Sequence, residues 1–306
     1  MKKMIGRCLR KILPWYLYKL IANGFIIVPK YYKNIIKDAE NYRDYSFQES
    51  DEKTMLLLRK HAHILDKGLH RQDASSGHSL GCYQELSEEI KHLQNTHLAK
   101  DPTYIWGQNK KTAYEELQRH PETFEPLHGE KPKSKIKFED FYEFIKQRRT
   151  IRYFLEKTIQ DAIIHQLKET VNWASNSCNK QPISLFVTND PTLASECLSL
   201  CAGGTGFGHF IPSFWAFTAD TRGYVWPSEL YLPAIDVSLG AQNVFLAAHT
   251  LGISGSILSW ALKTQEEERK LRNLLMIPKE YTIVFCAVMG YAAHWSQTPV
   301  RKTVSQ

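Results

Sequence analysis

The sequence predicts a protein of mixed α and β structure, in which a layered sandwich of helices and strands follows a helical N-terminal extension. Three observations support this fold class. Residues 31–120 repeat apolar side chains every three or four positions, as helices do. Residues 121–137 are rich in Pro and charged residues, as linkers are. From residue 138 onward, helical patterns alternate with short strand-like runs, which favours a layered arrangement.

The composition is that of a globular protein. Its 306 residues suit one to two domains, and an apolar fraction of 43% argues against long disordered regions. Six cysteines are spread over the chain without CxxC spacing: Cys8, Cys82, Cys178, Cys197, Cys201 and Cys286. We interpret them as reduced thiols and therefore expect a cytoplasmic protein.

The net charge of +7 is concentrated at the N-terminal end. Residues 1–43 hold ten Lys and Arg against two acids, which leaves residues 44–306 close to neutral. A basic end segment differs from the basic surface that a nucleic-acid-binding protein needs, so we expect no nucleic-acid partner.

Residues 1–30 combine basic and apolar side chains. On a helical wheel Ile5, Leu9 and Tyr16 share one face, and basic residues occupy the opposite face. This pattern is typical of a helix on an anionic membrane surface, and also of a helix packed on its own core or on a dimer partner. Two prolines and a lysine in residues 12–29 argue against a membrane-spanning helix, and no signal-peptide cleavage site follows. Any membrane contact is expected to be peripheral, at the inner face.

Three helices are expected in the extension. The clearest covers residues 52–69, where Met55, Leu58 and Leu65 follow helical spacing and Gly68 lies near the end. The others are expected at residues 83–98 and 112–119. The linker-like residues 121–137 place a domain boundary near 130–136, so we expect an extension over residues 1–135 and a second domain over residues 136–306.

The second domain is expected to alternate helices with strands. Strand-like runs cover residues 183–188, 213–218 and 281–289. Short helices are expected at 138–145 and after the capping pairs Thr158/Asp161, Asp190-Pro191 and Thr264/Glu267. Residues 236–251 are apolar on every side and predict a helix buried all round.

Three polar segments of this domain suggest a ligand site. Residues 148–152 carry three Arg and one Thr, a set that suits a phosphate, although a solvated basic helix end is the simpler interpretation of this segment alone. Residues 174–182 form a polar loop whose small side chains let the backbone approach a planar ligand. Near the end of the chain, residues 290–302 finish on an Arg-Lys pair that could close over a phosphate.

The order of these segments resembles the flavin nitroreductase family. That family is characterised by an RRSxRxF element, an APSxxNxQPW loop, a DxxxAxQNxxLAAxxLG helix and a GY…PxRK tail. This chain reads RRTIRYF, ASNSCNKQPI, DVSLGAQNVFLAAHTLG and GYAAHWSQTPVRK over residues 138–306. The segment LRKHAHILDKGL also resembles an HRxEKGL helix in a subgroup associated with surface-polysaccharide biosynthesis.

This resemblance implies an α+β fold, a nitroreductase-like three-layer α/β/α sandwich with a mixed central sheet. It also implies a homodimer that binds FMN at the subunit interface. The implied activity is an FMN-dependent oxidoreductase that carries hydride or electrons from NAD(P)H to a small organic acceptor such as a nitro compound or a quinone. The flavin carries the chemistry, so no catalytic side chain is implied.

The resemblance also implies which residues bind the cofactor. The residues that would contact the FMN phosphate, ribityl chain and pyrimidine edge are Arg148, Arg149, Thr150 and Arg152. Those that would reach the flavin of the partner subunit are Ser175, Asn176, Ser177 and Asn179. Those that would lie over the flavin ring, with a backbone N–H near N5, are Ser256, Ile257, Leu258 and Ser259. Arg301 and Lys302 would return to the phosphate.

The chain departs from the family pattern in the loop and near the second core strand. Ser175, Asn176, Cys178 and Ile183 stand where Pro, Ser, Gly and an aromatic residue are usual. Gly204-Thr205 replaces a usual Asn, so Thr205 takes the place of that cofactor contact. These departures leave an alternative function: a protein of this fold with little turnover, acting at a membrane surface or in a polysaccharide-biosynthesis complex.

Two further patterns predict no site. Residues 203–208 (GGTGFG) lack GxGxxG spacing and precede a strand, so they do not predict a dinucleotide-binding loop. His61 and His63 would face apart on a helix, and no Cys or carboxylate set completes a metal site with them. We therefore expect no bound metal.

Overall fold

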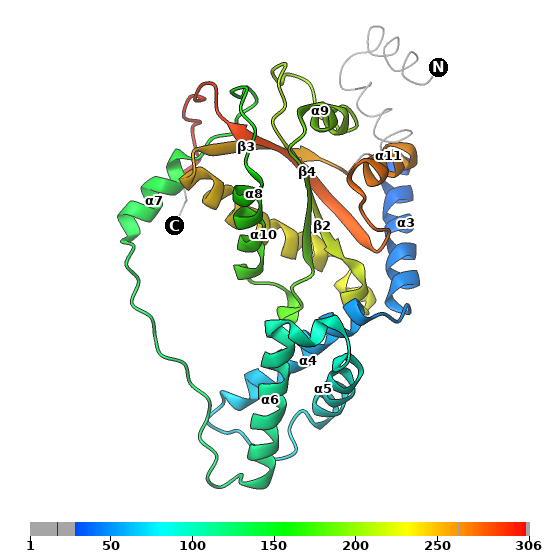
Figure 1. Cartoon of the computed structure of the whole chain (residues 1–306), viewed down its shortest axis with the longest axis vertical. Helices are drawn as coiled ribbons and strands as arrows, with labels where there is room; N and C mark the ends of the chain where they lie inside the picture. Colours follow the sequence, from blue (N-terminus) through cyan, green and yellow to red (C-terminus); the bar gives the residue numbers. More distant parts are fainter. Residues whose placement is uncertain (1–16, 18–27, 262, 304–306) are drawn as a thin grey trace.

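The computed structural model describes residue 17, residues 28–261 and residues 263–303 of the chain. Figure 1 shows a sheet with its helices in the upper part of the molecule and three helices below it, joined along one side by an extended linker. The predicted amphipathic helix over residues 1–30 lies almost entirely outside the described residues. Within the described part, no helix is long and apolar enough to cross a membrane.

The sheet has four strands in the order β1-β2-β4-β3, and every neighbouring pair is antiparallel. The strands are β1 (Ile183–Thr188), β2 (Phe214–Asp220), β3 (Ile253–Ser259) and β4 (Tyr281–Tyr291). All seven residues of β2 are buried, which fits its central position and its aromatic sequence. The predicted mixed character of the sheet is limited to one isolated parallel bridge between Thr150 and Gly255, at the outer edge of β3.

Helices cover both faces of the sheet and form the three layers that were predicted. One face packs against α10 (Leu232–Thr250) and α8 (Asp161–Glu169), with Trp215 and Phe217 in the core between them. The other face packs against α9 (Pro191–Ser199) and α11 (Gln265–Leu275), which enclose a core that includes Phe214 and Cys286. Alternate residues of β2 therefore serve the two cores, as the period of a strand requires.

Two of the three predicted helix starts are confirmed. Asp190 accepts a hydrogen bond from the N–H of Leu193 at 2.7 Å and begins α9 with Pro191 at its first position. Thr264 and Glu267 form a reciprocal capping box on α11. The predicted cap at Thr158 is wrong, because α8 begins at Asp161 without a side-chain cap. The intervening Ile159 is fully buried in the core, and this burial fixes the chain before the helix begins.

Helix α10 differs from the prediction of burial on all sides. Val237, Val244 and Ala248 are buried against the sheet, whereas Ile235 and Leu239 are 52% and 46% exposed. Helix α7 (Phe138–Gln147) also has no buried residue, and its Phe138 and Tyr142 rings are exposed. A single chain therefore leaves large apolar side chains of two helices in contact with solvent.

Helix α3 (Val28–Ser46) packs against the sheet domain although it comes early in the chain. The side-chain amide of Asn34 donates to the carbonyl oxygens of Ala261 and Lys263, both at 3.2 Å. The ammonium of Lys263 lies 3.6 Å from the Asp38 carboxylate. An early segment and a late segment of the sequence thus meet at this helix.

Helices α4 (Asp51–Leu69), α5 (Leu80–Leu93) and α6 (Pro102–Arg119) share a core of their own. Helix α5 ends five residues earlier than predicted, and a separate short helix follows at His97–Lys100. Helix α6 begins ten residues earlier than predicted, at Pro102, after the N-cap Asp101, whose carboxylate accepts from the N–H of Thr103 at 2.7 Å. The Asp-Pro pair that opens α6 was present in the sequence as a start signal.

Arg222 links this helical unit to the sheet. Its guanidinium pairs with Asp220 at 2.6 Å, at the end of β2, and donates to Ser50 Oγ at 3.0 Å, at the start of α4. Residues 120–137 contain no helix or strand. We propose on these grounds that residues 1–135 and 136–306 are the two parts of the chain, with α3 docked on the second.

Leu58→Ala is expected to destabilise helices α4–α6 without destabilising the sheet. Leu58 is fully buried in the core of α4–α6, and truncation of a buried Leu costs about 3 kcal/mol. Hydrogen exchange followed by mass spectrometry should show lost protection in α4, α5 and α6 and unchanged protection in β2 and β4. Ile105→Ala, at a half-exposed position of α6, is the matched control. Equal loss of protection in the sheet would contradict the proposed division.

Candidate functional site

One of the three polar segments, residues 148–152, lines a pocket of about 240 Å³ together with helix α10 and strand β3. It lies between the residues that follow α7, helix α10 and strand β3. Its lining residues are Arg148, Thr150, Arg152, Gln242, Phe245, Gly255, Ser256 and Ile257. We call it the arginine pocket. Five of the residues expected to contact the cofactor line it, and Gln242 and Phe245 come from the helix motif already quoted.

Residues 148–152 are fixed against the open edge of β3. The N–H of Ile151 donates to the carbonyl oxygen of Gly255 at 3.3 Å, and Thr150 forms the parallel bridge with the same glycine. The Ile151 side chain is 1% exposed and belongs to the core beneath the sheet. Because side chains of an extended segment alternate, burial of Ile151 turns Thr150 and Arg152 toward the pocket.

The pocket is positively charged. Burial lowers the pKa of the Arg148 guanidinium, and the charges of Arg301 and Arg149 lower it further. Arg148 and Arg301, from opposite ends of the domain, are therefore close together. Within the described part of the chain, the arginines that form ion pairs are Arg43, Arg59, Arg71, Arg119, Arg222 and Arg272. Among the described residues no carboxylate forms an ion pair with the arginines of this pocket. Such an uncompensated positive charge is typical of a site for an anion.

Arg149 is held away from the pocket lining. It is 9% exposed, and its guanidinium donates to the carbonyl oxygen of Arg148 at 2.9 Å and to Thr298 Oγ1 at 2.5 Å. It therefore ties the C-terminal tail to the end of α7. In the single chain these contacts position the tail, and the contact of Arg149 with a cofactor stays a prediction. Its neighbour Arg148 lines the pocket.

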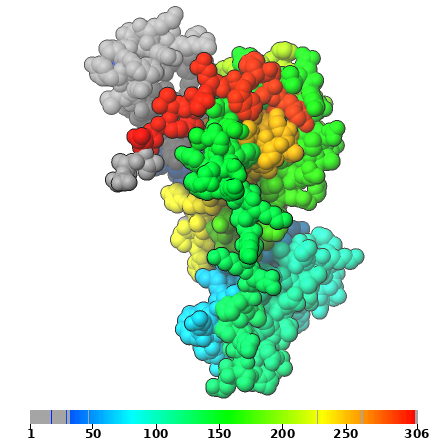
Figure 2. Space-filling model, turned by 90° about the vertical axis from the view of Figure 1, so that its left-hand side faces the viewer, coloured from blue at the N-terminus to red at the C-terminus, as the bar shows by residue number. Residues whose placement is uncertain are grey.

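His249 lies beside the arginines of this site, and the sequence did not predict its place there. Its ring lies 4.9 Å from that of Phe144 on α7 and 5.7 Å from that of Trp295 in the tail. Figure 2 shows this face of the molecule, where the red C-terminal tail lies beside the green segment around α7. Burial lowers the pKa of His249, and Arg148 and Arg149 lower it further. No spacing in the sequence predicts that His249 lies near Arg149, which is 100 positions earlier.

Strand β3 supplies one wall of the pocket. Ser256 is buried and Ile257 is 58% exposed, and both line the pocket. The Leu258 side chain points into the core on the other side, so Leu258 can offer only backbone atoms. Since the carbonyl of Gly255 faces the outer edge, the N–H of Ile257 two residues later faces the same edge. Ser259 lies beyond the lining, where it bridges to Ala202.

The polar loop over residues 175–181 lies outside the pocket of its own chain. The buried carboxylate of Asp236 accepts from the N–H and the hydroxyl of Ser177, both at 2.9 Å. The amide oxygen of Asn176 accepts from the N–H of Gln181 at 2.9 Å. Ser175 is exposed and Asn179 is partly buried. Asp236 precedes Gln242 by six residues, which places the loop about 9 Å along α10 from the pocket.

The last two predicted contacts are peripheral in a single chain. Thr205 is exposed in a loop whose Gly208 N–H donates to the carbonyl oxygen of Arg152 at 2.9 Å, so the loop lies beside the pocket without lining it. Lys302 is exposed in the tail.

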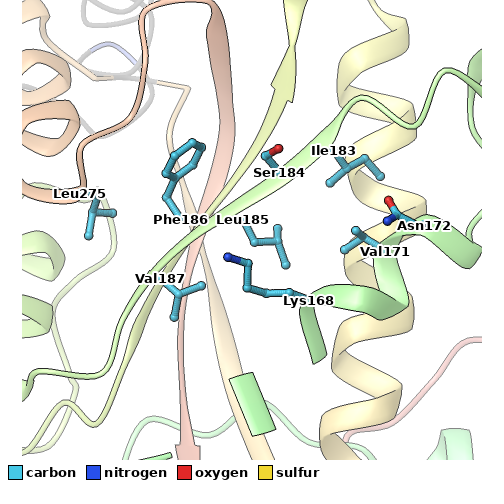
Figure 3. Close-up of a pocket in the computed structure, with 9 residues that line it drawn as sticks. All are labelled: Lys168, Val171, Asn172, Ile183, Ser184, Leu185, Phe186, Val187 and Leu275. Atoms are coloured by element: carbon cyan, nitrogen blue, oxygen red, sulfur yellow. The ribbon is translucent and has the colours of Figure 1, made fainter. Parts of the chain in front are cut away.

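A second hollow, of about 400 Å³, follows the outer edge of β1. Figure 3 shows its lining, which is mainly the strand itself with Lys168 and Asn172 on one side and Leu275 on the other. Lys168 is the only charged residue in that lining. Among the described residues no cluster of three or more His, Cys, Asp or Glu could hold a metal ion. Of the two pockets, the arginine pocket is therefore the stronger candidate for a ligand site in the described part of the chain.

His249 should report on an anion in the arginine pocket. Its pKa is held below the usual 6.5 only in the folded chain, so folding stability falls as the pH drops through about 6.5. An anion that neutralises Arg148 and Arg149 should raise the pKa of His249 toward its usual value. Proton NMR titration of the ring between pH 5 and 8, with and without inorganic phosphate, measures this shift, and His249→Gln assigns the signal. An unchanged pKa at saturating phosphate would contradict the assignment of an anion site.

Residues 148–152 of the arginine pocket and the polar loop lie within a segment that matches a family model. Residues 145–204 match the family model described as the Nitroreductase family. A protein of Archaeoglobus fulgidus named "Putative NADH dehydrogenase/NAD(P)H nitroreductase" is 28% identical over 156 residues, which is 50% of this chain and 86% of that protein. A protein of the same name from Methanothermobacter thermautotrophicus is 22% identical over 176 residues, or 52% and 81% of the two chains.

Solved structures include an FMN-dependent nitroreductase of Clostridium difficile R20291, with a TM-score of 0.45 at 18% identity over 51% of this chain and 90% of that one. The conclusion rests on the family model and the two sequence relatives, whose own length is covered for more than four fifths. By the family model over residues 145–204 and by these relatives over about half of its length, this chain is similar to the nitroreductase family.

Proposed function

We propose that this protein is an FMN-dependent oxidoreductase that binds the flavin phosphate in the arginine pocket. The observation that carries the proposal is that Arg148 and Arg152 line one pocket, that the charge of Arg301 from the C-terminal tail acts on Arg148, and that no carboxylate of the described residues forms an ion pair with them. Guanidinium groups suit phosphate because each offers several N–H donors in a fixed plane. The names of the sequence relatives support a redox function.

The residues present fit this cofactor. Two buried nitrogen atoms of the cluster, Arg149 Nε and His249 Nδ1, have no hydrogen-bond partner among the described residues. Such orphan groups are costly in a folded protein and indicate a missing anion or water. Gln242 and the free N–H of Ile257 can bind the polar edge of a planar ring, and Phe245 offers an apolar contact.

Each residue then has a defined task. Arg148 and Arg152, with Arg301 and Lys302 from the tail, would hold the phosphate, and Thr150 the ribityl chain or the pyrimidine edge. Ser256 and Ile257 would support the ring, with the Ile257 N–H as the donor toward N5. When bound, FMN supplies the hydride and electron chemistry, while the protein binds and orients it. NAD(P)H is the proposed reductant, and a small nitro compound or quinone is the proposed acceptor.

A homodimer would complete the site. At about 240 Å³ the arginine pocket is smaller than the 300–1,000 Å³ of most ligand pockets. The exposed apolar face of α10, with Ile235 and Leu239, lies on the same helix as Gln242. A second copy packed on this face would cover it and bring its own loop, with Ser177 and Asn179, toward the pocket. The aromatic side chains of α7 offer further apolar surface for the same partner.

FMN and riboflavin titrations test the phosphate site. Arg148→Ala is expected to weaken FMN binding about tenfold to a hundredfold, since a charged hydrogen bond contributes about 1.5–3 kcal/mol. Riboflavin, which has no phosphate, should bind both proteins alike. Visible absorbance and flavin fluorescence measure the affinities.

Arg269→Ala, at an exposed position of α11, is the matched control and should bind FMN as the wild type does. A colourless wild-type protein that takes up no added FMN would refute the proposed function.

Leu239→Glu is expected to separate the subunits. A carboxylate at the centre of the apolar α10 face would have to be buried unpaired in the dimer. Sedimentation velocity should show a monomer, and FMN affinity should fall with it. Lys270→Glu, on the exposed side of α11, is the control for added negative charge. A wild-type monomer that binds FMN fully would rule out the shared site.

A further inference from the structure

Lys180 is a fully buried cation at the end of the polar loop. Its exposed fraction is 0%, and its ammonium donates to Glu229 Oε1 at 2.5 Å. The same ammonium lies 4.7 Å from the centre of the Tyr224 ring. The other oxygen of Glu229 accepts from the backbone N–H groups of Val225 and Trp226, at 2.9 and 3.1 Å. Lys180 is therefore anchored to a carboxylate that is itself fixed to the backbone.

The Glu229 carboxylate remains charged although it lies against the buried Lys180 side chain. Burial alone would raise the pKa of Glu229, but the hydrogen bond and the charge of Lys180 outweigh it, and the pKa is lowered. Replacing a buried ion pair with apolar side chains is often neutral or stabilising, so such a pair is weak evidence for a role in stability. Its geometry, in contrast, is strongly directional. The pair is better suited to fixing the position of the chain at residue 180.

The loop needs such an anchor, because its backbone is strained. Cys178, Asn179 and Gln181 have φ angles of 52°, 53° and 54°, in the left-handed region that non-glycine residues rarely adopt. Strained residues of this kind persist only where their surroundings hold them. Asp236 holds Ser177 before the strained residues, and Glu229 holds Lys180 among them.

The helical extension contacts the same point from the outside. The guanidinium of Arg59 on α4 lies with Nη1 3.5 Å from the carbonyl oxygen of Lys180. The Nε of the same arginine donates to Thr103 Oγ1 of α6 at 2.8 Å. A side chain at Gly223 would come within 3.4 Å of Leu56 on α4 and 3.6 Å of Lys180. Helix α4 therefore packs closely against the network that holds the loop.

We propose that Lys180 is a positioning residue: its ion pair with Glu229, braced by Arg59 of the extension, holds residues 176–179 where they reach the flavin of the partner subunit. This inference rests on the proposed function and assigns a task to the helical extension, which is to brace a cofactor loop. Lys180 itself touches neither cofactor nor substrate in this arrangement. Its effect is exerted through the loop backbone.

Two variants separate positioning from stability. Lys180→Met keeps the approximate length of the side chain but removes the cation that pairs with the Glu229 carboxylate, so both thermal stability and FMN affinity should fall. Lys180→Met with Glu229→Gln removes both charges. It should regain most of the thermal stability, whereas FMN affinity should stay about tenfold below wild type, because the loop has lost its anchor. Lys270→Met, at an exposed position of α11, is the matched control.

Hydrogen exchange of residues 176–181 gives a readout that needs no flavin. Faster exchange in both Lys180 variants, with unchanged exchange in β2 and β4, supports the positioning role. Unchanged loop exchange in Lys180→Met, or a double variant that recovers FMN affinity together with stability, overturns it. Failure of the wild type to bind FMN would overturn the proposed function separately, since the exchange of the loop would still report on the anchor.

Mixed dimers show whether the loop acts across the interface. A dimer of one Arg148→Ala subunit and one Lys180→Met subunit contains one intact site if the loop serves the partner's pocket. It contains none if the loop serves its own. Binding of about one FMN per mixed dimer with wild-type affinity and visible spectrum is the expected result. Weak binding at both sites would overturn the action in trans.

Discussion

Repulsion between guanidinium groups is the constraint around which this domain is organised. Burial lowers the pKa of the Arg148 guanidinium most, the nearby charges of Arg301 and Arg149 lower it further, and no carboxylate of the described residues forms an ion pair with these three side chains. Like charges in a half-buried site oppose folding, so the surrounding structure must hold them together. That structure consists of the Ile151 side chain in the core, the bridge from Thr150 to Gly255 and the tail fixed by Arg149.

The sheet domain and the helical extension contribute to the site in different ways. Strand β3 and helix α10 form the walls of the arginine pocket directly. The extension lies outside the pocket, and its contacts through Arg59 and Arg222 reach the loop and the end of β2. Helix α3 packs along one side of the sheet domain and α4–α6 lie below it, so the extension contacts that domain at two places.

Local signals predicted most elements well. The run 183–188 became β1 at the same residues, and the polar caps at Asp190 and Thr264 began helices as expected. Prediction failed where burial or packing decided the outcome. Thr158 did not cap a helix because Ile159 is buried in the core. Helix α10 was predicted to be buried all round because its composition cannot show that one apolar face remains exposed in a single chain.

The sequence by itself determined the fold class, three of the four strands in the described residues and the candidate phosphate-binding segment, because these depend on spacing and residue type over short stretches. Only the tertiary structure decided that Arg149 binds the tail while Arg148 lines the pocket, that His249 joins the cluster, and that Lys180 is paired with Glu229. Each of these depends on which side chains meet across 46 or more residues of chain. Local periodicity carries no information about such meetings, because the packing of the two cores brings those residues together.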